Sequence, residues 1–144
     1  MSPRIITDAV SMAVVKSFLD EHKLPSGDLI LKGNNYIVGF YIDSRLVGTG
    51  ALEFYSSYSL LRSIALAEDL RGKSLGHMIV EHLIDVARQQ NVKAIFLLTE
   101  TAPAFFDKLG FIRIDRVTVP SEVKASTEFA AVCPVSAICM KLVL

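Results

Sequence analysis

The chain has 144 residues, 51% of them hydrophobic, and a positive mean hydropathy, so it can bury a core and is not intrinsically disordered. Fifteen basic and fifteen acidic residues give a net charge of zero, which removes any general attraction to nucleic acid or acidic membranes. No apolar run reaches the length of a membrane span, and the N-terminus lacks a signal-peptide pattern. We therefore expect one cytoplasmic domain, residues 1–144.

The first third of the chain predicts a strand, a helix and a hairpin. Residues 4–7 form a short apolar strand, and Thr7 or Asp8 can cap the helix that follows. The expected buried face of that helix consists of Val10, Ala13, Val14 and Phe18. Residues 36–42 and 46–55 are rich in β-branched and aromatic residues, which predicts an antiparallel hairpin. Gly48 and Gly50 in its second strand predict a bulge or a close approach by other backbone.

Residues 60–90 combine a buried strand (60–66), a basic glycine loop (71–76) and an amphipathic helix. The apolar face of the helix is formed by Leu75, Met78, Ile79, Leu83, Val86 and Ala87. Unpaired N–H groups at the helix start, the helix dipole and two cations, Arg71 and Lys73, predict a phosphate or pyrophosphate site. The alternative is an ordinary strand-to-helix connection with charged surface residues.

The rest of the chain completes a mixed sheet. Residues 94–98 form a continuous apolar strand, so residues 60–98 make a strand–helix–strand unit with two parallel strands. A short helix (102–109), a strand (111–114) and a final strand (137–142) follow. The predicted fold class is α/β (α+β), with a mixed, mostly antiparallel central sheet and helices on both faces.

Two motifs resemble those of the GNAT N-acetyltransferase superfamily. Residues 66–76 are similar to its acetyl-CoA signature, Gln/Arg-x-x-Gly-x-Gly/Ala: Arg71 and Gly76 match the ends, and Ser74 stands where the middle glycine is usual. Residues 105–111 resemble its Phe-Tyr-Glu-Lys-Leu-Gly-Phe block. Residues 61–63, 97–102, 111–116, 128–129 and 133–140 resemble a subgroup of small GNATs, the arsenic-resistance-operon and N-acetylglutamate-synthase-like enzymes.

This resemblance implies acetyl-CoA as cosubstrate, without a metal, bound where two strands splay apart. The implied coenzyme-binding residues are Ile64, Ala65, Leu66, Arg71, Gly72, Lys73, Ser74, Leu75, Gly76 and Phe106. Many members have at the Phe106 position a tyrosine that protonates the leaving thiolate. Phenylalanine has no such proton, so we expect Phe106 to pack in the core and cover the coenzyme.

The acceptor amine must lose a proton, and a carboxylate can take it. The candidates are Glu53, Glu68 and Glu100, each of which could instead be a solvated surface charge. Arg62 and Ser63 are the expected substrate-binding residues, with the Arg62 guanidinium holding an acceptor carboxylate. The alternative for Arg62 is a strand-end side chain that reaches solvent. Strand alternation places it with Ile64 unless a bulge intervenes.

The function expected from the resemblance is direct acetyl transfer to the primary amine of a small amino-acid-like acceptor, which could contain arsenic. A protein or peptide N-acetyltransferase and a non-catalytic acetyl-CoA sensor are the alternatives. We expect no nucleic-acid or membrane partner, and the apolar C-terminal strand could support a homodimer. Cys139 is expected to be buried and inert, and Cys133 to be exposed near the cleft.

Overall fold

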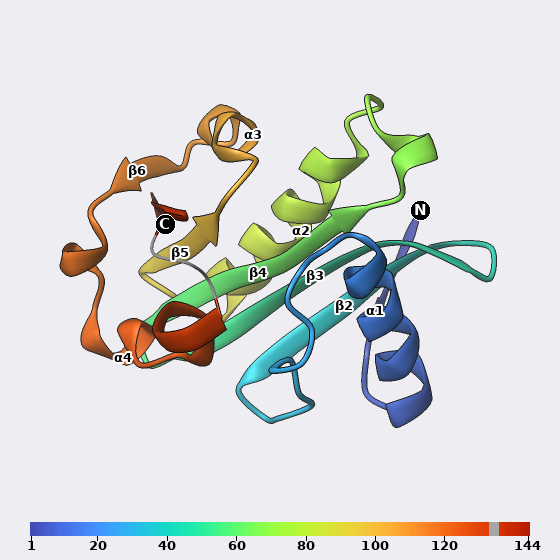
Figure 1. Ribbon diagram of the computed structural model, residues 1–144, viewed down its shortest axis with the longest axis horizontal. Coiled ribbons are helices and arrows are strands. Elements are labelled where there is room, and N and C mark those ends of the chain that lie inside the picture. The colour runs from blue at the N-terminus through green and yellow to red at the C-terminus, as the bar shows by residue number, and fades with distance from the viewer. Residues whose placement is uncertain (133–135) are drawn as a thin grey trace.

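A seven-stranded sheet forms the centre of the computed structural model, which describes residues 1–132 and 136–144 (Figure 1). Its spatial order is β1-β2-β3-β4-β5-β7-β6, and every neighbouring pair is antiparallel except β4 and β5. The strands are β1 (Ser2–Ile5), β2 (Asn35–Ile42), β3 (Arg45–Tyr55), β4 (Tyr58–Leu66), β5 (Ala94–Thr99), β6 (Ile112–Ile114) and β7 (Ile138–Val143). The predicted mixed, mostly antiparallel sheet and the parallel β4–β5 pair are thus confirmed.

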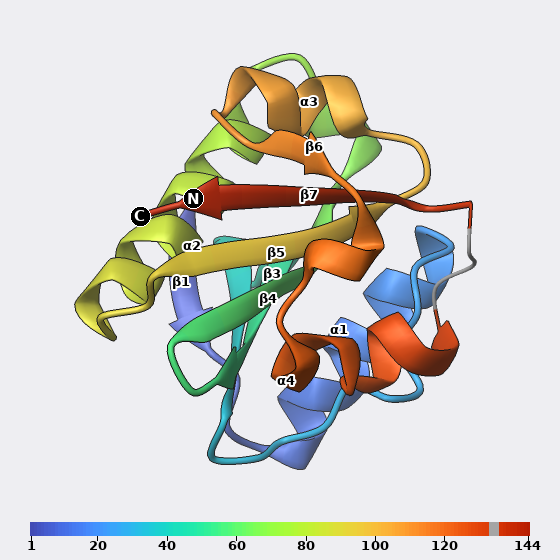
Figure 2. The same cartoon turned by 90° about the vertical axis from the view of Figure 1, so that its left-hand side faces the viewer.

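Helices cover both faces of the sheet, as predicted (Figure 2). They are α1 (Ala9–Glu21), α2 (Leu75–Gln89), α3 (Pro103–Lys108) and α4 (Ser121–Lys124), with short helical turns at Glu68–Leu70, Arg116–Thr118 and Glu128–Val132. One face packs on α2 and α3 through Leu83 and Phe106, and the other packs on α1 and α4 through Leu19 and Val123. None of the helices in the described ranges is long and apolar enough to cross a bilayer.

The buried face of α1 differs from the predicted one. Val10 is 78% exposed and Val14 is 49% exposed, whereas the buried positions are Met12, Val15 and Leu19. The helix has two apolar stripes at helical spacing, and packing against β2 and β3 selects the one that periodicity alone did not. In α2 the predicted Ile79, Leu83 and Ala87 are buried, but Met78 is 51% exposed.

The two parallel strands separate after a short contact. Their pairing is limited to Tyr58 with Ala94, Ser59 with Ile95 and Leu60 with Phe96. Beyond these positions β4 continues to Leu66 paired only with β3, and the end of β5 pairs only with β7. Each strand therefore turns one unpaired edge toward the other across a widening gap.

A β-bulge interrupts β4 at the edge of this gap. Thr49 pairs with Ala65 and Ala51 pairs with Arg62, so Ser63 and Ile64 together lie opposite Gly50. Ser63 has a φ of 60°, and its carbonyl accepts a 2.8 Å hydrogen bond from Thr49 Oγ1.

The bulge predicted in β3 lies next to Gly48, where Phe40 pairs with Gly48 and Tyr41 pairs with Leu46. The separate bulge in β4 changes the direction of Arg62. Ile64 packs on the α2 face of the sheet, whereas Arg62 contacts groups on the α1 and α4 face. The close approach expected at Gly50 comes from side chains and not from backbone: a β carbon there would collide with a methyl group of Leu83.

Candidate active site

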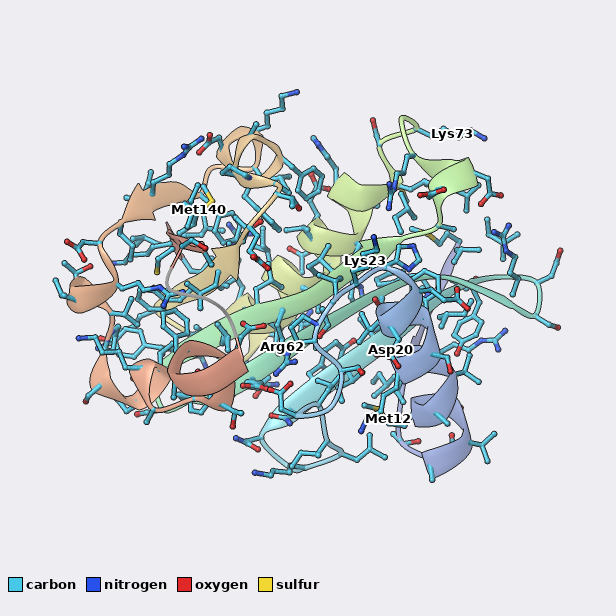
Figure 3. The ribbon with its side chains drawn as sticks, in the orientation of Figure 1. Met12, Asp20, Lys23, Arg62, Lys73 and Met140 are labelled. Atoms are coloured by element: carbon cyan, nitrogen blue, oxygen red, sulfur yellow. The ribbon has the colours of Figure 1, made fainter. Side chains whose placement is uncertain are left out.

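A cavity of about 840 Å³ lies between the separated ends of β4 and β5. Its walls come from the α1–β2 connection, residues 61–66 of β4, the start of α2, residues 97–102 and the start of α3. One end opens on the α2 helix start and the other reaches Arg62 and Glu128. Figure 3 shows Lys73 near the first end and Arg62 near the second.

The α2 end of the cavity has the geometry of an anion site. Gly72 (φ 82°) and Ser74 (φ 61°) both adopt left-handed conformations just before the helix. The first helical hydrogen bond runs from Met78 N to Ser74 O at 3.3 Å, so the preceding N–H groups have no acceptor within the helix. Leu75 to His77 line the cavity, which places these donors and the positive end of the helix dipole beside it.

Ser74 is the N-cap residue of α2, but its side chain makes no capping hydrogen bond. Its left-handed backbone explains why glycine is usual at this position. A residue with a β carbon pays about 1–2 kcal/mol for this conformation. Ser74 therefore keeps the backbone conformation of the glycine usual at this position, with a modest loss of stability.

Nine of the ten predicted coenzyme-binding residues line the cavity, and Lys73 does not. Gly76 leaves little spare room, since a β carbon there would lie 3.3 Å from the ring of Phe105. The walls are polar at the helix start and mainly apolar along Ile64 to Leu66. A coenzyme with a charged pyrophosphate and a long amide arm fits this distribution.

Phe106 closes part of the wall and belongs to the core, as predicted. It is 6% exposed and makes edge contacts with Phe105 (5.0 Å between centroids) and Phe111 (5.6 Å). Its ring can exclude water from the cavity but has no proton to donate.

At the other end, the Arg62 guanidinium lies among three carboxylates. Nη1 contacts Asp28 Oδ2 and Glu53 Oε2 (3.1 Å), and Nη2 contacts Asp28 Oδ1 (2.8 Å) and the Pro25 carbonyl (3.3 Å). Nε donates to Ser63 Oγ at 3.2 Å and lies 3.8 Å from Glu128 Oε1. Arg62 is only 3% exposed, so the alternative that it reaches solvent is wrong.

The cluster is held together by charge. Burial acts to lower the pKa of Arg62, but the hydrogen bond with Asp28 and the charges of Glu128, Asp28 and Glu53 outweigh it and raise that pKa. The same hydrogen bond holds the pKa of Asp28 below its usual value. Burial, together with a 2.6 Å hydrogen bond to Glu53 Oε1, raises the pKa of the Tyr55 hydroxyl.

The three predicted catalytic carboxylates lie in different places. Glu100 lines the cavity and is exposed. Glu53 is 6% exposed and contacts Arg62 from the adjacent strand without lining the cavity. The Glu68 side chain is 85% exposed and also lies outside the lining, beside Arg71. Ser63, the second predicted substrate residue, lines the cavity next to Arg62.

A model of the acetyltransferase (GNAT) family matches residues 8–111. The chain belongs to the GNAT acetyltransferase family. The amino-acid acetyltransferase of Mycobacterium tuberculosis is 37% identical over 81 residues, which are 55% of this chain and 45% of that relative. The matches span about half the length of the curated relatives.

Solved structures confirm the GNAT-like fold. Rv2747 of Mycobacterium tuberculosis, in complex with CoA and NLQ, has a TM-score of 0.76 at 23% identity, over 100% of this chain and 99% of that chain. N-acetylglutamate synthase from Neisseria gonorrhoeae, complexed with coenzyme A and L-arginine, has a TM-score of 0.74 at 15% identity. That match covers 99% of this chain and 33% of the synthase.

Two acidic residues of this GNAT chain were missed by sequence reasoning. Asp28 lies in the α1–β2 connection and Glu128 lies in the helical turn after α4, far from either motif. Neither segment has a periodicity that would have singled out these side chains, and the subgroup resemblance, which includes Glu128, gave it no role. The only sequence signal was Arg62 itself, since an arginine within an apolar strand needs carboxylate partners when it is buried.

Cys139 is buried in β7, and burial raises the pKa of its thiol to about 11, so the expectation of a buried thiol is confirmed. Cys133 lies outside the described residues. Among the described residues, no group of His, Cys, Asp or Glu has the arrangement of a metal site.

Proposed function

We propose that this GNAT chain transfers the acetyl group of acetyl-CoA directly to the primary amine of a small amino-acid-like acceptor. The observation that carries the proposal is the single cavity that joins the α2 helix start to the Arg62 cluster. One cavity can therefore hold a phosphate-bearing coenzyme at one end and a charged acceptor at the other.

In this proposal, the start of α2 holds the pyrophosphate through the backbone N–H groups of residues 72–77. The free edge of β4, at Ile64 to Leu66, pairs with the pantetheine arm as an additional strand would. Acetyl-CoA, when bound, supplies an activated acetyl thioester. The bulge at Ser63 and Ile64 interrupts the backbone pairing between β4 and β3. The N–H groups at the bulge can therefore donate to the oxyanion that develops on the thioester carbonyl.

The acceptor end supports an amino-acid-like substrate. Arg62 and Ser63 lie at the cavity wall, where a guanidinium and a hydroxyl can hold a carboxylate. The 37% identical relative is an amino-acid acetyltransferase, which agrees with this choice. The subgroup resemblance extends the proposal to arsenic-containing amino-acid analogues. A cytoplasmic location stays a prediction.

Thiol release from acetyl-CoA, measured with free amino acids, arsenic-containing analogues, simple amines and peptides, tests the proposal. We expect turnover with free amino acids or their analogues. Turnover with peptides alone would indicate a protein N-acetyltransferase. Tight CoA binding without turnover of any amine would indicate a sensor, for which the absence of a tyrosine hydroxyl at Phe106 is the supporting observation.

A further inference from the structure

Opposite charges lie side by side at the acceptor end of the cavity. Arg62 Nε and Glu128 Oε1 are 3.8 Å apart, and both residues line the cavity. They come from separate elements, since Arg62 lies in β4 and Glu128 follows α4 (Figure 3 labels Arg62). The cavity wall thus offers a cation and an anion within the span of one small molecule.

The two edges of the Arg62 guanidinium differ in their partners. The Nη1–Nη2 edge is bound by both oxygens of Asp28, and Nη1 also contacts Glu53; neither carboxylate lines the cavity. The Nε–Nη2 edge contacts Ser63 Oγ at 3.2 Å and the Pro25 carbonyl at 3.3 Å, and both residues line the cavity. These contacts are longer than the roughly 2.7–2.9 Å of good charge-assisted hydrogen bonds, so a carboxylate can replace them.

The charge of the cluster favours a ligand that brings a positive group. Three carboxylates surround one guanidinium, so the cluster formally has an excess of negative charge. A ligand with only a carboxylate would add to this excess, and a simple amine would leave the Nε–Nη2 edge weakly bonded. A zwitterion, whose carboxylate and ammonium are one carbon apart, can pair its carboxylate with Arg62 and its ammonium with Glu128.

We propose that Arg62 and Glu128 together bind the head group of an α-amino acid. The carboxylate lies on the Nε–Nη2 edge of Arg62, and the ammonium lies on Glu128, whose carboxylate can accept several hydrogen bonds at once. Glu128 is then the catalytic base: an N–H bond breaks, the proton moves to the Glu128 carboxylate, and the lone pair stays on nitrogen. Asp28 and Glu53 are positioning residues that hold Arg62 from the side away from the cavity.

This inference rests on the proposed acetyl transfer, and wild-type protein tests it first without any substitution. The probes are free L-amino acids, the corresponding amino-acid amides and simple primary amines, each with acetyl-CoA. We expect kcat/KM for the best amino acid to exceed that for its amide by about 100-fold, because the amide cannot form the charge-assisted pair. Equal turnover of acid and amide would overturn the inference and leave acetyl transfer standing.

Glu128→Gln tests the claim that Glu128 binds the ammonium and removes its proton. Glu122→Gln, on the exposed face of α4, is the matched control. We expect Glu128→Gln to lower kcat/KM for the amino acid by about 10²-fold or more, the scale of general-base catalysis, with an unchanged Kd for CoA. The control should keep wild-type activity. A Glu128→Gln variant that binds CoA and stays within threefold of wild type would overturn the assignment. No turnover of any amine by the wild type would overturn the proposed function itself.

Discussion

Removing the Arg62 guanidinium should strongly destabilise the fold. Arg62→Met would leave the Asp28, Glu53 and Glu128 side chains, which are 12%, 8% and 7% exposed, without their shared cation. Loss of one partner of a buried ion pair costs about 3–5 kcal/mol. With three carboxylates stranded, we expect the upper end of that range.

Asp28→Asn, which removes one carboxylate and keeps the guanidinium, should destabilise the fold less than Arg62→Met. It leaves Arg62 with two carboxylates, Glu53 and Glu128, so we expect a loss of only about 1.5–3 kcal/mol, the scale of a hydrogen bond to a charged group. The loss is larger for Arg62→Met than for Asp28→Asn because the cluster has three carboxylates and one guanidinium. A 5 kcal/mol loss corresponds to a fall in Tm of about 10–20 °C for a chain of this size.

The pH dependence distinguishes charge from packing. In the wild type, the pKa of Asp28 lies below its unfolded value, so its stabilising contribution is present near neutral pH and is lost as pH falls through the folded pKa. In Arg62→Met the Asp28 carboxyl is left without its cation, which favours its protonated form and should raise its folded pKa. The deficit of the variant should therefore shrink as pH falls from 7 toward 4.

Urea unfolding at pH 7 and pH 5 measures both effects through the free energy of unfolding. A matched change, Arg88→Met on the exposed end of α2, should cost less than about 1 kcal/mol at either pH, since Arg88 makes only a surface ion pair with Asp85. A deficit for Arg62→Met below 1 kcal/mol, or one that is equal at both pH values, would refute the electrostatic explanation.

Three further predictions concern packing, coenzyme binding and thiol chemistry. Gly50→Ala should lower the free energy of unfolding by about 1–3 kcal/mol, because the added methyl group would collide with Leu83 of α2. Gly33→Ala should cause no such loss, since a β carbon at Gly33 would meet nothing within 4 Å. Chemical denaturation measures both. Gly76→Val should raise the Kd for CoA at least tenfold in calorimetry by filling the helix start, and unchanged affinity would contradict the predicted pyrophosphate site. In a Cys133→Ser background, Cys139 should react with a thiol reagent at neutral pH only after unfolding, because burial raises its pKa to about 11.

The element order was predictable because its signals are local. The hairpin at 35–55, the long helix after Ser74 and the apolar strand at 94–99 each have a distinct periodicity. The face of α1 was not predictable in the same way. Two stripes of apolar residues satisfy helical spacing there, and only packing against the sheet decides between them.

The coenzyme end of the site followed from a contiguous motif, whereas the acceptor end did not. Residues 64–66, 71, 72 and 74–76 line the cavity from one short stretch of the chain, and the resemblance to the acetyl-CoA signature grouped them. Arg62 was identified, but its direction depended on a bulge at Ser63 that strand alternation does not reveal. Asp28 and Glu128 are brought to Arg62 from 34 and 66 positions away, and only the tertiary structure makes them neighbours.

Hydrogen exchange of the backbone amides, with and without CoA, tests most directly the claim that the separated ends of β4 and β5 form the coenzyme site. The account predicts slower exchange at residues 61–66 and 71–77 when CoA is added, and no change in the β2–β3 hairpin. Protection confined to other segments, or no protection at saturating CoA, would contradict it.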